Sequence, residues 1–220
     1  MAAWKTGLAS LAVALLAGIG AAQACEGDKV LFEDDFATLE PTWGAKSEEV
    51  DVAGNKLMLT PEANYTTWVP STANLYEDID FCADVSSVKA VDPDHSYAGL
   101  VFWYADDDNF YAFEFAANGN ASVWRRQRGK WLKQMNWQPA GALKQNDGAV
   151  NQLRVVTMGN EADFYINGSQ FGSIKGVPPA DGQQIGVIAS SPKDAVATYS
   201  VANLKVTEPS KDQSGNTQQQ

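Results

Sequence analysis

Apolar and polar residues alternate with a period of two along almost the whole chain after Gly27, and this pattern constrains the fold more than any other feature. Successive side chains of a β-strand point to opposite faces, so this period is typical of strands with one buried face. The segments end at Gly, Asn, Asp or Pro, which are common turn residues. The clearest are NKLMLT (55–60), YAGLVFWY (97–104), NFYAFEF (109–115), NQLRVVTM (151–158) and ATYSVANLKVT (197–207).

No long amphipathic helical pattern interrupts these segments, and the 220 residues show neither an internal repeat nor an internal linker. Short strands separated by turns are typical of an antiparallel sandwich or barrel. We therefore expect one all-β domain over residues 25–207. The end of the chain, 208–220, is polar and low in complexity, and we expect it to be a disordered tail.

The first 24 residues have a composition of their own. Lys5 precedes the apolar run LASLAVALLAGIGAA (8–22), and the small-x-small sequence AQA precedes Cys25. This order predicts a secretory signal peptide that is cleaved after Ala24, and hence export to the periplasm or the extracellular space. A second interpretation makes Cys25 the lipidated N-terminus of a lipoprotein. No other apolar segment is long enough to span a membrane, so we expect no integral membrane contact.

Cysteine and histidine are too few for a zinc site of the usual kind, which has four such ligands. Cys25 and Cys82 are the only cysteines, and His95, in the polar segment VDPDHSY, is the only histidine. Because an oxidising compartment favours disulfides, we predict a Cys25–Cys82 bond, and we expect His95 on the surface. The 27 acidic and 16 basic residues give a net charge of −11, which disfavours nucleic acid and anionic membranes as partners.

The stretch FWYADDDNFYAF (102–113) places three aspartates and an asparagine between two aromatic runs. We predict a hairpin with a two-residue loop at Asp107 and Asp108, since such residues bond nearby backbone. The register then sets Tyr104 opposite Tyr111, Phe102 opposite Phe113 and Leu100 opposite Phe115, all on the core face. It sets Trp103 and Val101 on the outer face. A weak calcium site at Asp106–Asp108 is left open, although a calcium loop usually has more widely spaced ligands.

The next hairpin follows from AANGNASVW (116–124), in which Asn118 and Gly119 indicate a turn. A two-residue loop would set Trp124 opposite Phe113 in the core. A three-residue loop over 118–120 sets Val123 opposite Phe115 and Trp124 beside Glu114 on the outer face, and we prefer it. Exposed tryptophans next to carboxylate and guanidinium groups suit sugar recognition. The candidate ligand-binding residues are Trp103, Glu114, Trp124, Arg126, Trp131 and Trp137.

Several of these stretches resemble the concanavalin A-like lectin/glucanase superfamily, in particular its laminin-G-like and keto-disaccharide-hydrolase-like (DUF1080-type) bacterial domains. The resemblance is carried by AGLVFWYADDDNFYAFEFAANG (98–119), RRQRGKW (125–131), NQLRVVTMGNEADFYINGSQFGSIKG (151–176), GQQIGVIAS (182–190) and ATYSVANLKV (197–206). LFEDDF (31–36), with Trp43, is similar to the first strand of these domains. The resemblance implies a two-sheet jelly roll that often binds glycans on a concave sheet, and members include both lectins and hydrolases.

The glucanases of this superfamily carry acids that alternate on one strand, and retaining hydrolysis needs two carboxyl groups about 5 Å apart. The nearest match is YEDIDFCADV (76–85), where Asp78, Asp80 and Asp84 alternate with a cysteine between them. We interpret these aspartates as the solvated side of a strand whose Leu75, Ile79, Phe81 and Val85 face inward. We therefore assign no catalytic residue.

Three hypotheses follow for the function. The first is an exported, non-catalytic module that binds carbohydrate or another cell-envelope component, without a cofactor. The second is a glycoside hydrolase of the same fold, in which Glu114 is the acid because tryptophans desolvate it. The third is a structural or protein-interaction domain. The sequence does not predict the identity of the ligand or the oligomeric state.

Overall fold

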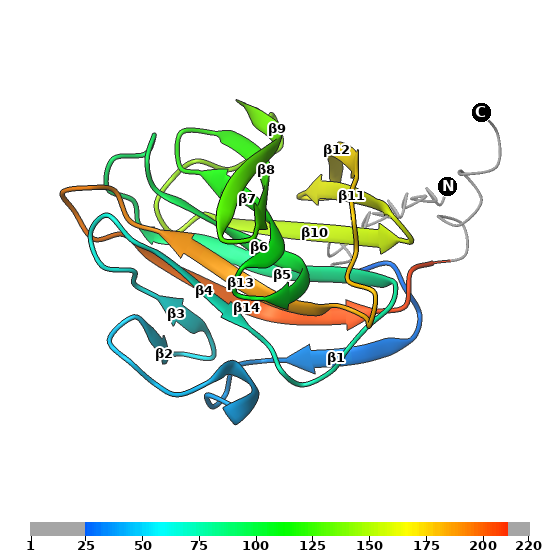
Figure 1. Cartoon of the computed structure of the whole chain (residues 1–220). Helices are drawn as coiled ribbons and strands as arrows, with labels where there is room; N and C mark the ends of the chain where they lie inside the picture. The colour runs from blue at the N-terminus through cyan, green and yellow to red at the C-terminus, as the bar shows by residue number, and fades with distance from the viewer. Residues whose placement is uncertain (1–24, 211–220) are drawn as a thin grey trace, which may run out of the picture.

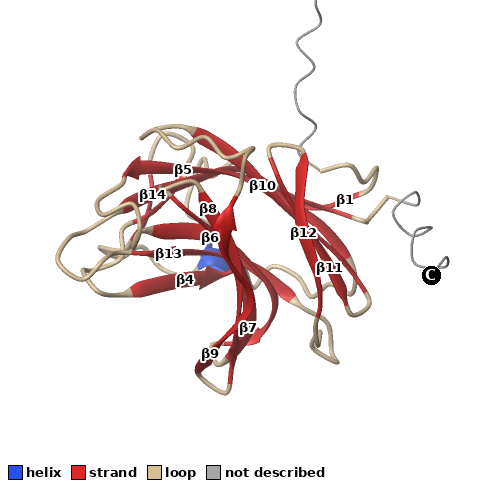
Figure 2. Cartoon of the chain, turned by 90° about the horizontal axis from the view of Figure 1, so that it is seen from above, coloured by secondary structure: helices blue, strands red, loops and turns tan. Residues whose placement is uncertain are grey.

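The computed structural model describes residues 25–210, and these residues form two antiparallel sheets packed face to face (Figures 1 and 2). Sheet A has the order β12-β11-β10-β5-β14-β3-β2, with β1 also paired to β14. Its strands are β1 (Val30–Asp34), β2 (Val50–Val52), β3 (Leu57–Leu59), β5 (Ile79–Lys89), β10 (Val150–Met158), β11 (Glu161–Ile166), β12 (Ser169–Lys175) and β14 (Thr198–Thr207).

Sheet B has the order β4-β13-β6-β7-β8-β9. Its strands are β4 (Thr66–Pro70), β6 (Tyr97–Asp106), β7 (Asn109–Ala116), β8 (Asn120–Gln127), β9 (Lys130–Pro139) and β13 (Gln184–Ser190). The described residues also contain one short 3-10 helix, η1 (Pro41–Trp43). The all-β sandwich predicted from the alternation is thus confirmed. No helix within residues 25–210 is long and apolar enough to cross a membrane. The predicted signal peptide and residues 211–220 of the predicted tail lie outside the described residues.

The main core lies between the two sheets, where the inward side chains of each strand meet. Phe113 of β7 lies 4.9 Å from Phe164 of β11, ring centre to ring centre, and Phe102 of β6 lies 5.5 Å from the same ring. These aromatic side chains are fully buried. Burial of large apolar side chains is the main stabilising contribution to a fold of this size. Where a strand of sheet B alternates regularly, every second residue faces this core and the remaining residues form the outer face of the sheet.

The β6–β7 hairpin turns where the sequence predicted, but the predicted register is wrong beyond the turn. Asp106 pairs with Asn109 across Asp107 and Asp108, whereas Phe102 pairs with Tyr111 and Leu100 with Phe113. Between these positions Trp103, Tyr104 and Ala105 face only Phe110, which makes a β-bulge. Trp103 takes a left-handed backbone conformation there, with φ of 45°.

The bulge exchanges the faces of two aromatic residues. Trp103 turns into the main core with 1% of its surface exposed, while Tyr104 moves to the outer face of sheet B. The prediction of Trp103 on the outer face, and of Tyr104 in the core, is therefore wrong. A bulge reverses the alternation because it inserts extra residues on one strand only.

The β7–β8 hairpin has a three-residue loop, as predicted, but the loop consists of residues 117–119 and begins one residue earlier. Phe113 therefore pairs with Val123, and Ala112 pairs with Trp124. A shift of two residues keeps each side chain on its face. Val123 is accordingly in the core and Trp124 on the outer face, as the sequence predicted.

The disulfide between Cys25 and Cys82 is confirmed, and it ties the start of the described chain to the middle of β5. We predicted that the neighbouring Asp80 is solvated, and this prediction is wrong. Its side chain is fully buried, and both of its oxygens pair with the guanidinium of Arg154 at 2.7 and 2.9 Å. Ile79, Phe81 and Val85 are buried as predicted. Leu75 lies before β5 and is 64% exposed, so its predicted inward position is wrong.

A candidate aromatic binding pocket on sheet B

The outer face of sheet B contains a pocket of about 260 Å³. Strand pairing assembles it from segments far apart in the sequence. Tyr97 of β6 pairs with Ser190 of β13, which in turn pairs with Thr66 of β4. Glu114 of β7 pairs with Ser122 of β8. The pocket is lined by Thr66, Tyr97, Glu114, Trp124, Trp131, Trp137 and Ser190.

Glu114 is the only carboxylic acid that lines this pocket. Its residue is 6% exposed, and within the described part of the chain its carboxyl group has no hydrogen bond or ion pair. Loss of hydration disfavours the charged form, so burial raises the pKa of Glu114 to about 7. Near neutral pH the pocket therefore holds a carboxyl group that is close to half ionised.

Gly99 of β6 lies directly opposite Glu114. A Cβ atom at this glycine would lie 1.9 Å from the carbonyl oxygen of Phe113, so no other residue fits there without moving the strand. The close approach of β6 and β7 beside Glu114 thus depends on this glycine.

Aromatic side chains form the walls of the pocket. The rings of Tyr97 and Trp137 lie 5.1 Å apart, and Trp124 donates its indole N–H to the hydroxyl of Ser122 at 3.0 Å. The ammonium of Lys133 lies 5.8 Å from the ring centre of Trp124. Trp131 is 37% exposed, which places it at the rim of the pocket. Indole faces beside a carboxyl group provide both apolar area and a hydrogen-bonding group.

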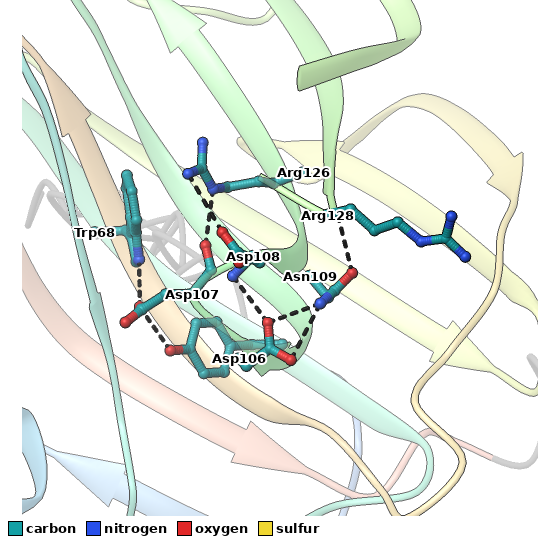
Figure 3. Close-up of polar contacts among 8 residues, drawn as sticks. Trp68, Asp106, Asp107, Asp108, Asn109, Arg126 and Arg128 are labelled. Atoms are coloured by element: carbon teal, nitrogen blue, oxygen red, sulfur yellow. Dashed lines mark hydrogen bonds and ion pairs between the residues drawn. The ribbon is translucent and has the colours of Figure 1, made fainter. Parts of the chain in front are cut away.

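A second aromatic group on the same face adjoins the pocket at Trp131. The guanidinium of Arg126 lies 5.0 Å from the ring centre of Trp68 and 5.6 Å from that of Trp131. Phe110 contacts both tryptophans, with ring centres at 5.3 and 5.4 Å. Arg126 also donates to the carbonyl oxygen of Asp107, so its position is fixed from two sides (Figure 3).

The three aspartates of the β6–β7 turn are structural in this fold (Figure 3). Asp106 accepts hydrogen bonds from the backbone N–H of Asp108 and from the amide of Asn109. Asp107 accepts from the indole N–H of Trp68 at 2.8 Å and from the hydroxyl of Tyr104 at 2.9 Å. Within residues 25–210 no group of three or more His, Cys, Asp and Glu side chains is arranged to hold a metal ion.

Of the six candidate ligand-binding residues, four line one pocket: Glu114, Trp124, Trp131 and Trp137. Arg126 lies beside the pocket, stacked on Trp131, and Trp103 lies in the core. Sequence reasoning missed Thr66, Tyr97 and Ser190. The alternation in YAGLVFWY puts Tyr97 on the face opposite Leu100, so this residue carried a usable signal. Thr66 and Ser190 carried none, because they arrive through the pairing of β4 with β13.

Comparison with known proteins finds likeness at the level of structure only. No family model matches the chain, and no curated sequence does. A carbohydrate-binding module, CBM66 from Bacillus subtilis, superposes with a TM-score of 0.53 at 14% identity, over 68% of this chain and 86% of the module. The Bacillus licheniformis β-glucanase superposes with a TM-score of 0.57 at 9% identity, over 80% of this chain and 97% of the glucanase.

A variant of a GH43 protein from Bacillus licheniformis superposes with a TM-score of 0.61 at 14% identity, over 80% of this chain but only 39% of that protein. Identities this low show a shared fold and do not transfer an activity. The similar structures support the two-sheet β-sandwich fold. They show neither the laminin-G-like nor the DUF1080-type domains as the family of this chain.

Proposed function

We propose that this protein is an exported, non-catalytic module that binds carbohydrate, or another cell-envelope component, in the pocket on the outer face of sheet B. The observation that carries the proposal is the lining itself, in which three tryptophans and a tyrosine surround one carboxyl group. A pyranose ring has an apolar face that stacks on indole and hydroxyls that bond to carboxyl and hydroxyl groups. Thr66 and Ser190, whose hydroxyls are hydrogen-bonded to each other, add two such groups to the lining.

The first experiment is a glycan array probed with the chain that starts at Cys25, in calcium and then in chelator. We expect specific, saturable binding without release of product. Trp124→Ala should weaken binding tenfold or more, about the cost of truncating a central aromatic residue at an interface. Tyr165→Ala, an aromatic truncation on sheet A, is the matched control and should bind normally. No binding in either condition would favour a protein partner instead.

The second candidate function is a glycoside hydrolase in which Glu114 is the general acid. It is favoured by one observation, the raised pKa of Glu114, which is near 7 and suits an acid that works at neutral pH. The hydrolase is disfavoured because most glycoside hydrolases use a pair of carboxyl groups. Among the described residues no second carboxyl group lines the pocket. Release of reducing ends by the native protein, abolished in Glu114→Gln, would establish the hydrolase and overturn the binding module.

A further inference from the structure

The unpaired carboxyl group of Glu114 determines what kind of ligand the pocket accepts. Among the described residues no lysine, arginine or histidine forms an ion pair with it, although only 6% of the surface of Glu114 is exposed. A buried carboxylate without a counter-ion is costly, and a ligand that supplies the positive charge removes that cost. The described residues of the pocket thus supply a negative group without a positive partner.

The aromatic walls favour the same kind of ligand. Indole and phenol rings attract cations through the negative potential of their faces, and Trp124, Trp131, Trp137 and Tyr97 surround the carboxyl group. Arg126, which lies beside Trp131, is engaged elsewhere. It is bonded to the carbonyl of Asp107 and paired with Asp108 at 3.7 Å.

Lys133 lies over the ring of Trp124 at 5.8 Å and has no ion pair among the described residues. The indole of Trp124 thus already attracts an ammonium group, although Lys133 itself does not line the pocket. An acidic protein surface, with a net charge of −11, further favours the approach of a cationic ligand.

We propose that the preferred ligand is a sugar that carries a free, protonated amine, such as a deacetylated hexosamine, with its ammonium against Glu114 and its ring against a tryptophan. This inference rests on the proposed carbohydrate-binding function and names its ligand class. The amine donates charge-assisted hydrogen bonds to the carboxylate, while the ring covers the indole. The pKa of Glu114, near 7, agrees with this arrangement, because a cation would convert the half-ionised group into its charged form.

The test compares two matched probes by calorimetry at pH 7, the tetramer of glucosamine and the tetramer of N-acetylglucosamine. They share the same backbone and differ in charge and acetylation. We expect the amino tetramer to bind about ten- to a hundredfold more tightly, the range that one hydrogen bond to a charged group provides. Choline chloride, a cation without a sugar ring, should bind at least tenfold more weakly than the amino tetramer.

Two variants separate the pocket from the general attraction between an acidic protein and a cation. Glu114→Gln should reduce the preference for the amino tetramer to about twofold or less, since it removes the pocket's only carboxylate. Glu33→Gln makes the same substitution on an exposed side chain of sheet A, away from the pocket, and should keep the full preference.

The outcomes distinguish this inference from the proposed function. If the acetylated tetramer binds as well as the amino tetramer, the inference is overturned and the carbohydrate-binding function stands. Equal binding of choline, or an unchanged preference in Glu114→Gln, also overturns the inference. If neither tetramer binds while the glycan array reports other sugars, only the ligand class is wrong. If no sugar binds at all, both proposals fall.

Discussion

The buried Glu114 makes the stability of the fold depend on pH. Its pKa is raised to about 7 in the folded protein, above the ordinary value of 4.5, so folding favours the protonated form. The resulting stabilisation is fully present below about pH 4.5 and is lost as the pH rises through 7, by about 3 kcal/mol. We expect Glu114→Gln to gain stability relative to the native protein between pH 5 and pH 8.

The measurement is the free energy of unfolding in urea at both pH values, for the native protein, Glu114→Gln and the control Glu33→Gln. Comparing proteins cancels the contributions of other titrating groups, such as His95. If the difference between native and Glu114→Gln is the same at pH 5 and pH 8, the carboxyl group is not desolvated as described.

Truncation of two tryptophans should lower the free energy of unfolding by very different amounts. Trp103 is 1% exposed in the main core, and its replacement by alanine leaves a large cavity, so we expect a loss of about 3–5 kcal/mol. Trp131 is 37% exposed at the rim of the pocket, and Trp131→Ala should cost about 1 kcal/mol or less. Urea unfolding measures both. Similar losses in the two variants would contradict the placement of Trp103 inside the bulge.

For individual residues, the sequence correctly predicted the face of the sheet on which a side chain lies wherever the strand is regular. Glu114 and Trp124 were placed on the outer face because β7 and β8 alternate without interruption up to those positions. Trp103 was assigned to the wrong face because a bulge reverses the alternation, and no local feature of FWYADDD indicates the bulge. Space for the Trp103 ring depends on Gly176, far along the chain, where a Cβ atom would lie 2.2 Å from that ring.

At the level of the element, the β6–β7 hairpin depends on one of its aspartates more than on the next. The carboxylate of Asp107 accepts hydrogen bonds from Trp68 and Tyr104, whereas the carboxylate of Asp108 has, among the described residues, only a 3.7 Å pairing with Arg126 and is largely exposed. We expect Asp107→Ala to cost about 1–3 kcal/mol, because two donors lose their acceptor, and Asp108→Ala less than about 1 kcal/mol.

Urea unfolding of the two variants, with and without calcium, checks this prediction and the role of the turn together. The described contacts predict the same ranking in both conditions. A stabilisation of the native protein by calcium that Asp108→Ala removes would contradict a purely structural turn and would reopen the cation site.

Turns and strands were predictable from the sequence because their signals are local. Asp107 and Asp108 were placed in the β6–β7 loop from turn chemistry and from the facing of the flanking aromatic residues. A three-residue loop was predicted near Gly119 from the size of the facing side chains. The exact pairing was not, because a shift of two residues preserves the faces and leaves the local pattern equally satisfied. Register is fixed instead by contacts across the sandwich, such as that of Phe113 with Phe164.

For the whole molecule, the sequence predicted a two-layer β-sandwich but not which strands are neighbours. The pocket shows the consequence, since Thr66 and Ser190 reach it through the pairing of β4 with β13, more than a hundred residues apart in sequence. The buried pair of Asp80 with Arg154 was missed for the same reason. An aspartate in an alternating strand is predicted to be solvated unless its partner strand is known. The partner strand here, β10, lies much later in the chain than β5.

The N-terminal segment is attached to sheet A by the Cys25–Cys82 disulfide and by polar contacts, among them an ion pair of Glu26 with Arg154 at 2.8 Å. In addition, Asp80 accepts hydrogen bonds from the backbone N–H groups of Glu26 and Gly27 at 2.8 and 3.2 Å, while Arg154 holds its carboxylate in place. The chain then enters β1, which pairs with β14. Removal of the disulfide therefore frees the chain in the unfolded state without releasing this segment in the folded state.

We expect replacement of Cys25 and Cys82 together by alanine to lower the free energy of unfolding by about 4 kcal/mol, through the entropy of the open loop. The amides of Glu26 and Gly27 should nevertheless stay protected in hydrogen exchange, because the Asp80 carboxylate still binds them. The native protein in reductant is the matched control and should behave alike. If both amides exchange freely while the β5 amides remain protected, the disulfide alone holds the segment, and the buried Asp80–Arg154 pair serves only the packing of β5 against β10.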